Sequence, residues 1–201
     1  MHPNPAFRGA EAARALALVR ERGFGTLAVN GPDGPLMSHV PVLLAEDSAA
    51  LDLHLVRSNP IARLGTVAAV VAVTGPDAYV SPDWYGVPDQ VPTWNYVAVH
   101  LRGTLRPLPP EEMRDMLDRQ SAATEARLAP KAPWRTDKMT PDALERMMRA
   151  ILPFRLTVED VQSTFKASQN KPEAVRLAAA AAVEGGMGAE LAAMAALMRE
   201  G

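Results

Sequence analysis

Strand-like segments follow one another along this chain, with no helix between most neighbouring pairs. Each is an apolar or alternating run bounded by turn-forming residues. Parallel neighbours would need a crossover of about a dozen residues or more, usually a helix. The spacing therefore argues against a parallel sheet and predicts a mainly β, antiparallel barrel with helices packed outside it. The expected strands are 24–30, 36–44, 51–56, 67–73, 78–81, 93–106 and 154–165.

Finer features of these strands can also be predicted. In the third strand, three leucines alternate with Asp52 and His54, so these two should face away from the core. Gly75 and Pro76 should end the fourth strand. The run 93–106 should be the longest strand, with Val97 on its apolar face.

Helices are expected between and after these strands. The pattern predicts helices at 10–22, 111–127 and 139–150, and an alanine-rich helical tail from Lys171 that is broken at Gly185 and Gly186. We expect two parts, a barrel with inserted helices at 1–170 and a helical segment at 171–201. The second part should pack on the barrel or on a partner subunit.

Composition excludes several classes of protein. The 201 residues are 48% hydrophobic, which is enough for a real core, and the net charge is -2. No strong positive field is present to attract nucleic acid. The absence of cysteine removes disulfides and thiolate metal sites. The longest apolar run, 178–183, is too short to span a bilayer, and the start does not resemble a signal peptide. We expect a cytoplasmic protein.

Motif searches narrow the chemistry further. His39, His54 and His100 fall on three separate strands at no ligand spacing, so no metal site is expected. The chain contains no G-x-S-x-G, P-loop or G-x-G-x-x-G motif, which leaves triad hydrolases, nucleotide hydrolases and Rossmann enzymes without support.

The turn after the third strand is a candidate anion site. Asn59 before Pro60 is typical of a helix start, where exposed N–H groups bind anions. The Ser58 hydroxyl and the side chains of Arg57 and Arg63 lie near it in sequence. A phosphate would suit this group, and a plain helix cap with solvated arginines is the alternative.

Aromatic residues and a polar run mark two further segments. Five of the six tryptophans and tyrosines lie between Tyr79 and Tyr96, which fits either a stacking surface for a planar ligand or a loop held onto the barrel by its own rings. The run 166–170 offers polar donors at a strand end. Within it, Asn170 and Glu173 have the spacing of a capping box.

Together these segments resemble one family. The runs GPDAYVSPDWY at 75–85, VPTWNYVAVH at 91–100 and FKASQN at 165–170 resemble the PaiB family of bacterial FMN-binding negative transcriptional regulators. The segments 3–7, 38–41 and 54–60 fit as well. The chain departs from the family at His2, where many relatives have tyrosine, and in a longer loop at 85–91.

The resemblance implies a fold and a cofactor. It implies a six-stranded Greek-key split barrel that forms a homodimer with FMN in interfacial clefts. It places the FMN phosphate at the turn 57–63 and the flavin ring along 38–41, with 94–96 and 166–170 closing the cleft. The implied cofactor-binding residues are Ser38, His39, Val40, Pro41, His54, Arg57, Ser58, Asn59, Arg63, Trp94, Asn95, Tyr96, Lys166, Ser168, Gln169 and Asn170.

The implied function is negative transcriptional regulation, but the residues do not favour direct DNA contact. The best helix-turn-helix candidate is 172–199, and its second helix, 189–199, has no basic face. Two alternatives use the same cleft. One is an FMN-dependent oxidoreductase, in which the flavin itself carries the hydride, and the other is a haem-binding barrel.

Overall fold

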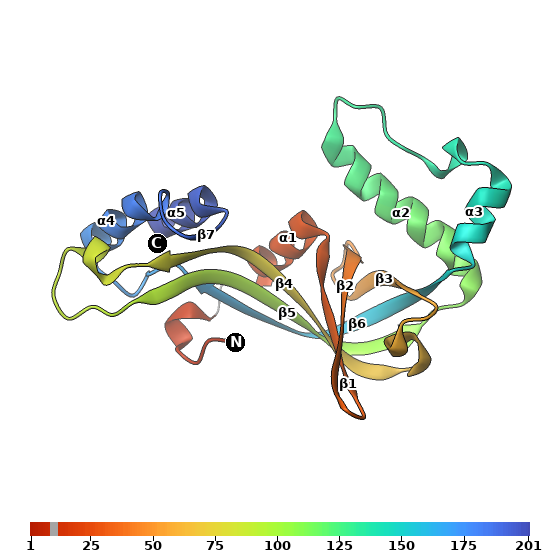
Figure 1. Cartoon of the computed structure of the whole chain (residues 1–201), viewed down its shortest axis with the longest axis horizontal. Helices are drawn as coiled ribbons and strands as arrows, with labels where there is room; N and C mark the ends of the chain where they lie inside the picture. Colours follow the sequence, from red (N-terminus) through yellow and green to blue (C-terminus); the bar gives the residue numbers. More distant parts are fainter. Residues whose placement is uncertain (9–11) are drawn as a thin grey trace. The chain divides into compact units, whose positions relative to one another are not determined.

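The computed structural model of the chain describes residues 1–8 and 12–201 (Figure 1). Six strands form a barrel in the order β1-β2-β3-β6-β5-β4, and β4 pairs back onto β1, with Ala28 opposite Val70. β6 lies between β3 and β5, which gives the Greek-key connectivity that the family resemblance implies. The strands are β1 (Phe24–Gly31), β2 (Gly34–Leu44), β3 (Ala50–Val56), β4 (Val67–Val80), β5 (Thr93–Pro107) and β6 (Ile151–Lys166).

The chain divides into two compact units. The barrel unit consists of 19–73 and 100–161, and the terminal unit of 1–18, 74–99 and 162–201, apart from the undescribed 9–11. The residues from 171 onward therefore belong to one unit with the N-terminal residues and with segments of β4, β5 and β6.

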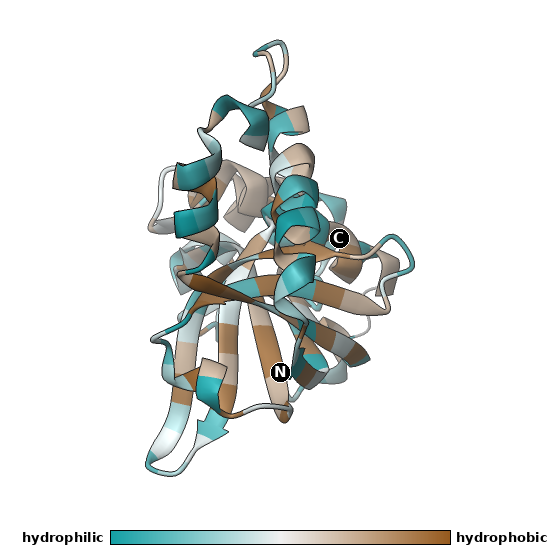
Figure 2. Ribbon diagram, turned by 90° about the vertical axis from the view of Figure 1, so that its right-hand side faces the viewer, coloured by the Kyte–Doolittle hydropathy of each residue, from teal (hydrophilic) through white to brown (hydrophobic). Residues whose placement is uncertain are grey.

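The core of the barrel unit comes from the alternating strands. Leu51 and Leu53 on β3 stand opposite Leu156 and Phe154 on β6, and all four are fully buried. Hydrophobic residues recur along the strands in Figure 2. Two helices belong to this unit, α2 (Met113–Glu125) and α3 (Pro141–Met148). Burial of this apolar surface is the main stabilising term of the fold.

The terminal unit has its own apolar core. α4 (Glu173–Val183) and α5 (Leu191–Glu200) pack on each other and on the strand residues Ala78, Val80 and Val97. A two-residue strand, β7 (Gly188–Ala189), pairs with β4. Gly188 is required there, because its φ is +150° and a Cβ would lie 2.3 Å from the Asp77 carbonyl oxygen.

The structure corrects several expectations about the elements. β4 continues through Gly75 and Pro76 as one strand, because proline tolerates an extended backbone and the missing Cβ of Gly75 lets Val97 approach closely. β6, with 16 residues, is longer than β5, with 15. α1 spans Ala12–Arg22, and its predicted start at Ala10 lies outside the described residues. In the described part of the chain, no helix is long and apolar enough to cross a membrane.

Candidate functional site

The turn after β3 gathers several of the predicted residues of the barrel unit. The Asn59 side chain accepts a hydrogen bond from the Ile61 N–H at 2.9 Å and donates one to Ser38 Oγ on β2 at 3.1 Å. One amide group therefore caps the 3-10 turn Pro60–Arg63 and joins it to β2. This bond brings Ser38 beside Asn59, and the part of these residues in FMN binding stays a prediction.

The structure corrects the expected source of the donors at this turn. The helical segment is a four-residue 3-10 turn, and its first N–H groups are already bonded. Asn59 caps the Ile61 N–H, and the Ala62 N–H bonds to the Asn59 carbonyl oxygen. Pro60 has no N–H to offer. An anion at this turn would therefore be bound by side chains and not by a helix start.

The side-chain donors at the turn differ in how firmly they are held. Ser58 and Arg63 are exposed and form no hydrogen bond or ion pair with the described residues. Arg57 donates from Nε to the Arg149 carbonyl oxygen at 3.0 Å and lines a pocket of about 260 Å³ with residues of α2 and α3. Arg57 is therefore held through its Nε atom on the side of α3, whereas the Arg63 side chain has no such bond to the described residues.

The other predicted residues of β2 and β3 have varied surroundings. His39 is exposed, and its Nδ1 lies 3.0 Å from Thr26 Oγ1 on β1. Val40 is buried in the core, so only its backbone remains for a ligand, whereas Pro41 is exposed. The Nδ1 atom of His54 lies 3.2 Å from Gln120 Oε1 on α2. Burial lowers the pKa of His54, and this bond partly offsets the effect.

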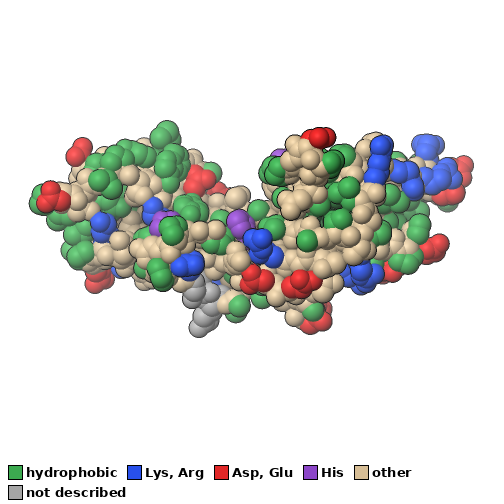
Figure 3. All heavy atoms as spheres, turned by 90° about the horizontal axis from the view of Figure 1, so that it is seen from below, with side chains coloured by type: hydrophobic (Ala, Val, Ile, Leu, Met, Phe, Trp, Pro, Cys, Tyr) green, Lys and Arg blue, Asp and Glu red, His purple; other side chains and the backbone are tan. Residues whose placement is uncertain are grey.

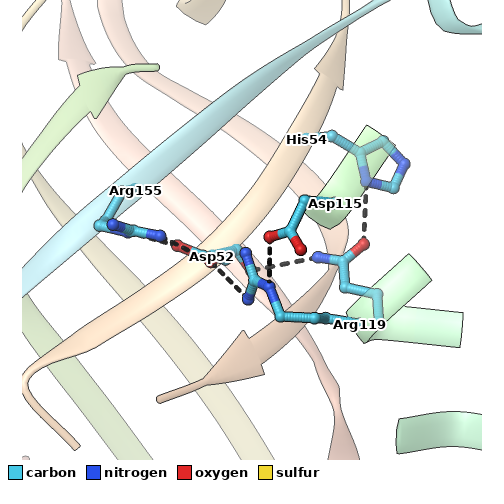
Figure 4. A network of polar contacts seen from close by, with 6 residues as sticks. Asp52, His54, Asp115, Arg119 and Arg155 are labelled. Carbon is cyan, nitrogen blue, oxygen red and sulfur yellow. Dashed lines mark hydrogen bonds and ion pairs between the residues drawn. The ribbon is translucent and has the colours of Figure 1, made fainter. Parts of the chain in front are cut away.

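A buried ion network beside His54 was not predicted (Figure 4). Asp52 is only 4% exposed, contrary to its expected place on an open face. It accepts two hydrogen bonds from Arg155, at 2.6 and 3.0 Å, and pairs with Arg119 at 2.9 Å. Burial pushes the pKa of Asp52 upward, but the two arginines outweigh it and hold this pKa below its ordinary value. Gln120 donates to the Asp52 carbonyl oxygen and so links the network to His54.

In the terminal unit, two predicted residues lie deep in the structure. Asn95 on β5 is fully buried and donates to Ser168 Oγ at 2.9 Å. The Tyr85 hydroxyl lies 2.8 Å from the same oxygen. These bonds hold Ser168 at a φ of +60°, which is uncommon outside glycine. The structure thus shows a structural role for Asn95 and Ser168, and their part in flavin binding stays a prediction.

The aromatic residues of this unit serve mainly to hold its loop. Tyr79 contacts Trp84 and Trp94 edge to face, at 6.4 and 6.1 Å between ring centroids. Trp84 and Tyr85 pack against the core formed with α4 and α5. Trp94 remains 45% exposed and Tyr96 half-buried. Trp84 and Tyr85 therefore hold their own loop onto the unit, as one of the two alternatives predicts. Part of the Trp94 side chain stays exposed to solvent.

The residues of the polar run 166–170 have two roles: one holds the N-terminal segment, and others line an open pocket. Gln169 accepts from the Ala167 N–H and donates to the Ala6 carbonyl oxygen at 3.1 Å, which ties down the N-terminal segment. Lys166 and Asn170 line a pocket of about 230 Å³. The predicted capping box is wrong, because α4 begins at Glu173 with Pro172 at its N-cap and has no side-chain cap.

The sequence-predicted residues therefore form two groups, one in each unit. The barrel unit holds those of 38–41, 54 and 57–63, and the terminal unit holds those of 94–96 and 166–170. Sequence reasoning missed Asp52 and its arginines. The cross-strand register of β3 and β6 would have indicated Arg155, whereas Arg119 comes from α2. It also missed Phe7, Thr93 and Lys171, which line the 230 Å³ pocket.

Two other features of the described residues bear on ligands. A pocket of about 430 Å³ lies between α2 and the segment 126–137, and it contains none of the predicted residues. Arg114, Asp118 and Thr136 bond to one another at its wall. Across residues 1–8 and 12–201, no three histidine or carboxylate side chains are grouped to hold a metal ion.

Comparison with known proteins identifies related sequences. Residues 1–160 match the family described as "Putative FMN-binding domain". The "Protease synthase and sporulation protein PAI 2" of Bacillus subtilis (strain 168) is 32% identical over 171 residues, which cover 83% of this chain and 81% of that protein.

Solved structures with the same fold are more distant in sequence. The FAD and heme binding protein from Mycobacterium smegmatis has a TM-score of 0.57 and 17% identity, over 80% of this chain and 73% of that one. The flavocytochrome Anf3 from Azotobacter vinelandii has a TM-score of 0.53 and 9% identity, over 83% of this chain and 72% of that one. At these identities the likeness shows the fold alone.

Proposed function

Because this chain belongs to the PaiB family of FMN-binding domains, we propose that it holds the phosphate of FMN at the turn after β3. In this proposal, Ser38, Ser58 and Arg63 supply the phosphate donors and Asn59 positions them. The flavin ring lies along β2, beside His39. The protein acts as a homodimer in negative regulation of transcription, without touching DNA itself.

One observation carries the phosphate assignment, the bridge that Asn59 makes between the 3-10 turn and Ser38. Ser38 Oγ accepts from Asn59 Nδ2, so its own hydroxyl hydrogen is left to donate. The Ser58 hydroxyl and the Arg63 guanidinium are exposed and unengaged by the described residues. Two hydroxyl donors and a guanidinium suit a phosphate, since charge-assisted hydrogen bonds to phosphate are among the stronger ones.

The protein's own contribution at this site is binding and orientation. FMN, when bound, supplies a ring that can take up or release a hydride. Along β2, His39 is fixed by Thr26, and Ser38 is fixed by Asn59. These bonds preorganise the strand edge, which lowers the cost of ordering a ligand there.

The phosphate assignment can be tested by comparing FMN with riboflavin, which lacks the phosphate. We expect Arg63→Ala and Ser58→Ala each to raise the Kd for FMN by about tenfold or more. Each variant removes about 1.5 kcal/mol or more of charge-assisted hydrogen bonding to the phosphate. Riboflavin affinity should change little. Arg127→Ala, at an exposed arginine after α2, is the matched control. Equal losses for both ligands would refute the assignment.

The visible spectrum of the purified protein is a further check on the cofactor. A flavin absorbs near ~450 nm and a haem has its Soret band near ~400 nm, because each cofactor carries its own chromophore. A Soret band without flavin absorption would contradict the proposal and favour a haem-binding barrel.

The indirect mode of regulation is supported by the charges of the C-terminal helices. α5 buries Met194, Ala195 and Met198, and its terminal residues Arg199 and Glu200 are paired with Glu184 and Arg14. Lysines and arginines on the face drawn in Figure 3 lie among carboxylates and apolar atoms. A recognition helix would instead present several basic or amide side chains to bases and phosphates.

We therefore expect no sequence-specific binding to duplex DNA at about 0.15 M salt, with or without FMN. An anisotropy titration against the DNA upstream of regulated genes measures this. Sub-micromolar, sequence-dependent binding would overturn the indirect mode.

The homodimer is supported by large apolar side chains on the surface of the barrel unit. Phe24 on β1 is 54% exposed and Met37 on β2 is 66% exposed. Burying such a side chain contributes about 1.5–3 kcal/mol, so these positions favour a partner that covers them. We expect a dimer in sedimentation at micromolar concentration and a shift toward monomer for Met37→Arg. A wild-type monomer would contradict the proposal.

A further inference from the structure

A pocket of about 230 Å³ lies wholly within the terminal unit. Three segments far apart in sequence form it: the N-terminal residues, the loop between Tyr85 and β5, and the run that follows β6. It is lined by His2, Phe7, Tyr85, Asp89, Gln90, Val91, Thr93, Lys166, Ser168, Asn170 and Lys171.

Two lysines give this pocket its charge. Lys166 Nζ donates to Thr93 Oγ1 and lies 5.7 Å from the centre of the Phe7 ring. Lys171 Nζ donates to Gln90 Oε1 and lies 5.3 Å from the centre of the Tyr85 ring. Within the described residues, neither ammonium group pairs with a carboxylate. Both are therefore held by neutral partners, through hydrogen bonds and cation–π contacts.

The other charged groups of the pocket do not cancel this charge. Asp89 is the one carboxylate among its lining residues, so two ammonium groups face a single negative charge. His2 lines the pocket and is fixed by the Asn4 N–H, which donates to its Nδ1 atom at 3.1 Å. Burial lowers the pKa of Lys166, since its charge has lost part of its hydration without gaining a counter-ion.

The walls of the pocket are firmly held. The Ser168 hydroxyl is bonded by both Tyr85 and Asn95, and its backbone is kept at a φ of +60°. Such backbone conformations persist only where the surroundings impose them, and they cluster at ligand sites. Gln169 fixes the neighbouring N-terminal segment through the Ala6 carbonyl oxygen. The segments around the two lysines are thus held in place before any ligand binds.

We propose that this pocket binds the phosphate or carboxylate group of a small molecule other than FMN, with Lys166 and Lys171 as its charge partners and Asn170 as a further donor. The volume of about 230 Å³ lies below the roughly 300–1,000 Å³ of sites that enclose drug-sized ligands, so the pocket fits an anionic group on a small body and not a whole flavin. The inference rests on the terminal unit alone and goes beyond the proposed FMN site.

The test uses the full chain and inorganic phosphate as the probe, followed by ¹H–¹⁵N NMR. We expect saturable shifts at the amides of Thr93, Asn170 and Lys171, in FMN-free and in FMN-loaded protein alike. Acetate, as a carboxylate probe, should shift the same amides. The FMN-free protein is measured first. A failure to bind FMN would therefore count against the proposed function, but it would not affect the proposed anion site.

Variants separate the role of charge from that of folding. Lys166→Gln and Lys171→Gln should each raise the Kd for phosphate by about tenfold or more, since each loses a charge-assisted bond. Lys171→Arg keeps the charge and should retain phosphate binding. Lys138→Gln removes an exposed lysine of the barrel unit and is the matched control. An unchanged pattern of amide peaks in the free variants shows that they fold.

Three results would overturn the inference. The first is the absence of saturable shifts at these amides with either anion. The second is an equal loss in Lys138→Gln, which would mean a general charge effect. The third is loss of phosphate binding once FMN is loaded, which would make the pocket the phosphate site of the flavin itself.

Discussion

Replacing Asp52 with asparagine should destabilise the barrel unit, because this carboxylate is the centre of a buried ion network. The Asp52 side chain is 6% exposed, whereas those of Arg155 and Arg119 are 29% and 41% exposed. Removing one partner of a fully buried pair costs about 3–5 kcal/mol. Because both arginines can regain part of their hydration, we expect a smaller loss of about 2–3 kcal/mol.

Urea denaturation of wild type and Asp52→Asn measures this loss directly. In a chain of this size it corresponds to a decrease in Tm of about 4–12 °C. Asp115→Asn is the matched control, since Asp115 also pairs with Arg119, at 2.7 Å, but its side chain is 71% exposed. That exposed pair should contribute only about 0.3–0.5 kcal/mol.

The pH dependence gives a second measure of the same network. The pKa of Asp52 is lower in the folded protein than in the unfolded chain, where an aspartate titrates near about 3.9. The stabilisation is therefore complete above the unfolded value and is lost as the pH falls through the folded one. The gap between wild type and Asp52→Asn should shrink below about pH 4. The reasoning is refuted if Asp52→Asn loses no more stability than Asp115→Asn at neutral pH.

Two further predictions concern single positions. Gly188→Ala should destabilise the protein by about 1–3 kcal/mol in urea denaturation, since its φ is +150° and a Cβ would meet backbone atoms of β4. Gly185→Ala, where a Cβ would meet nothing within 4 Å, is the control, and equal effects would contradict the argument. Gln120→Ala should lower the pKa of His54 further in an NMR titration, because it removes the bond that offsets burial. A rise in this pKa would contradict the argument, because it would show that the bond to Gln120 does not favour the charged imidazole.

Local patterns were enough to predict most elements of the barrel. Apolar or alternating runs, with turn residues between them, placed β1, β2, β3 and the apolar face of β5, because a strand's period of two is a property of the chain itself. The Asn59-Pro60 pair likewise marked a capped turn, and a cap needs only its immediate neighbours.

Only the tertiary structure shows the features that form when segments distant in sequence come into contact. The sequence pattern predicts an exposed Asp52. Its partner Arg155 lies 103 residues later in the chain, and only the pairing of β6 with β3 brings it opposite Asp52. β4 passes through Gly75 and Pro76 because Val97 packs where a side chain would have stood. The pocket of Lys166 and Lys171 needs three distant segments. Burial and pairing set the charge and pKa of such groups, and neither exists until the chain has folded.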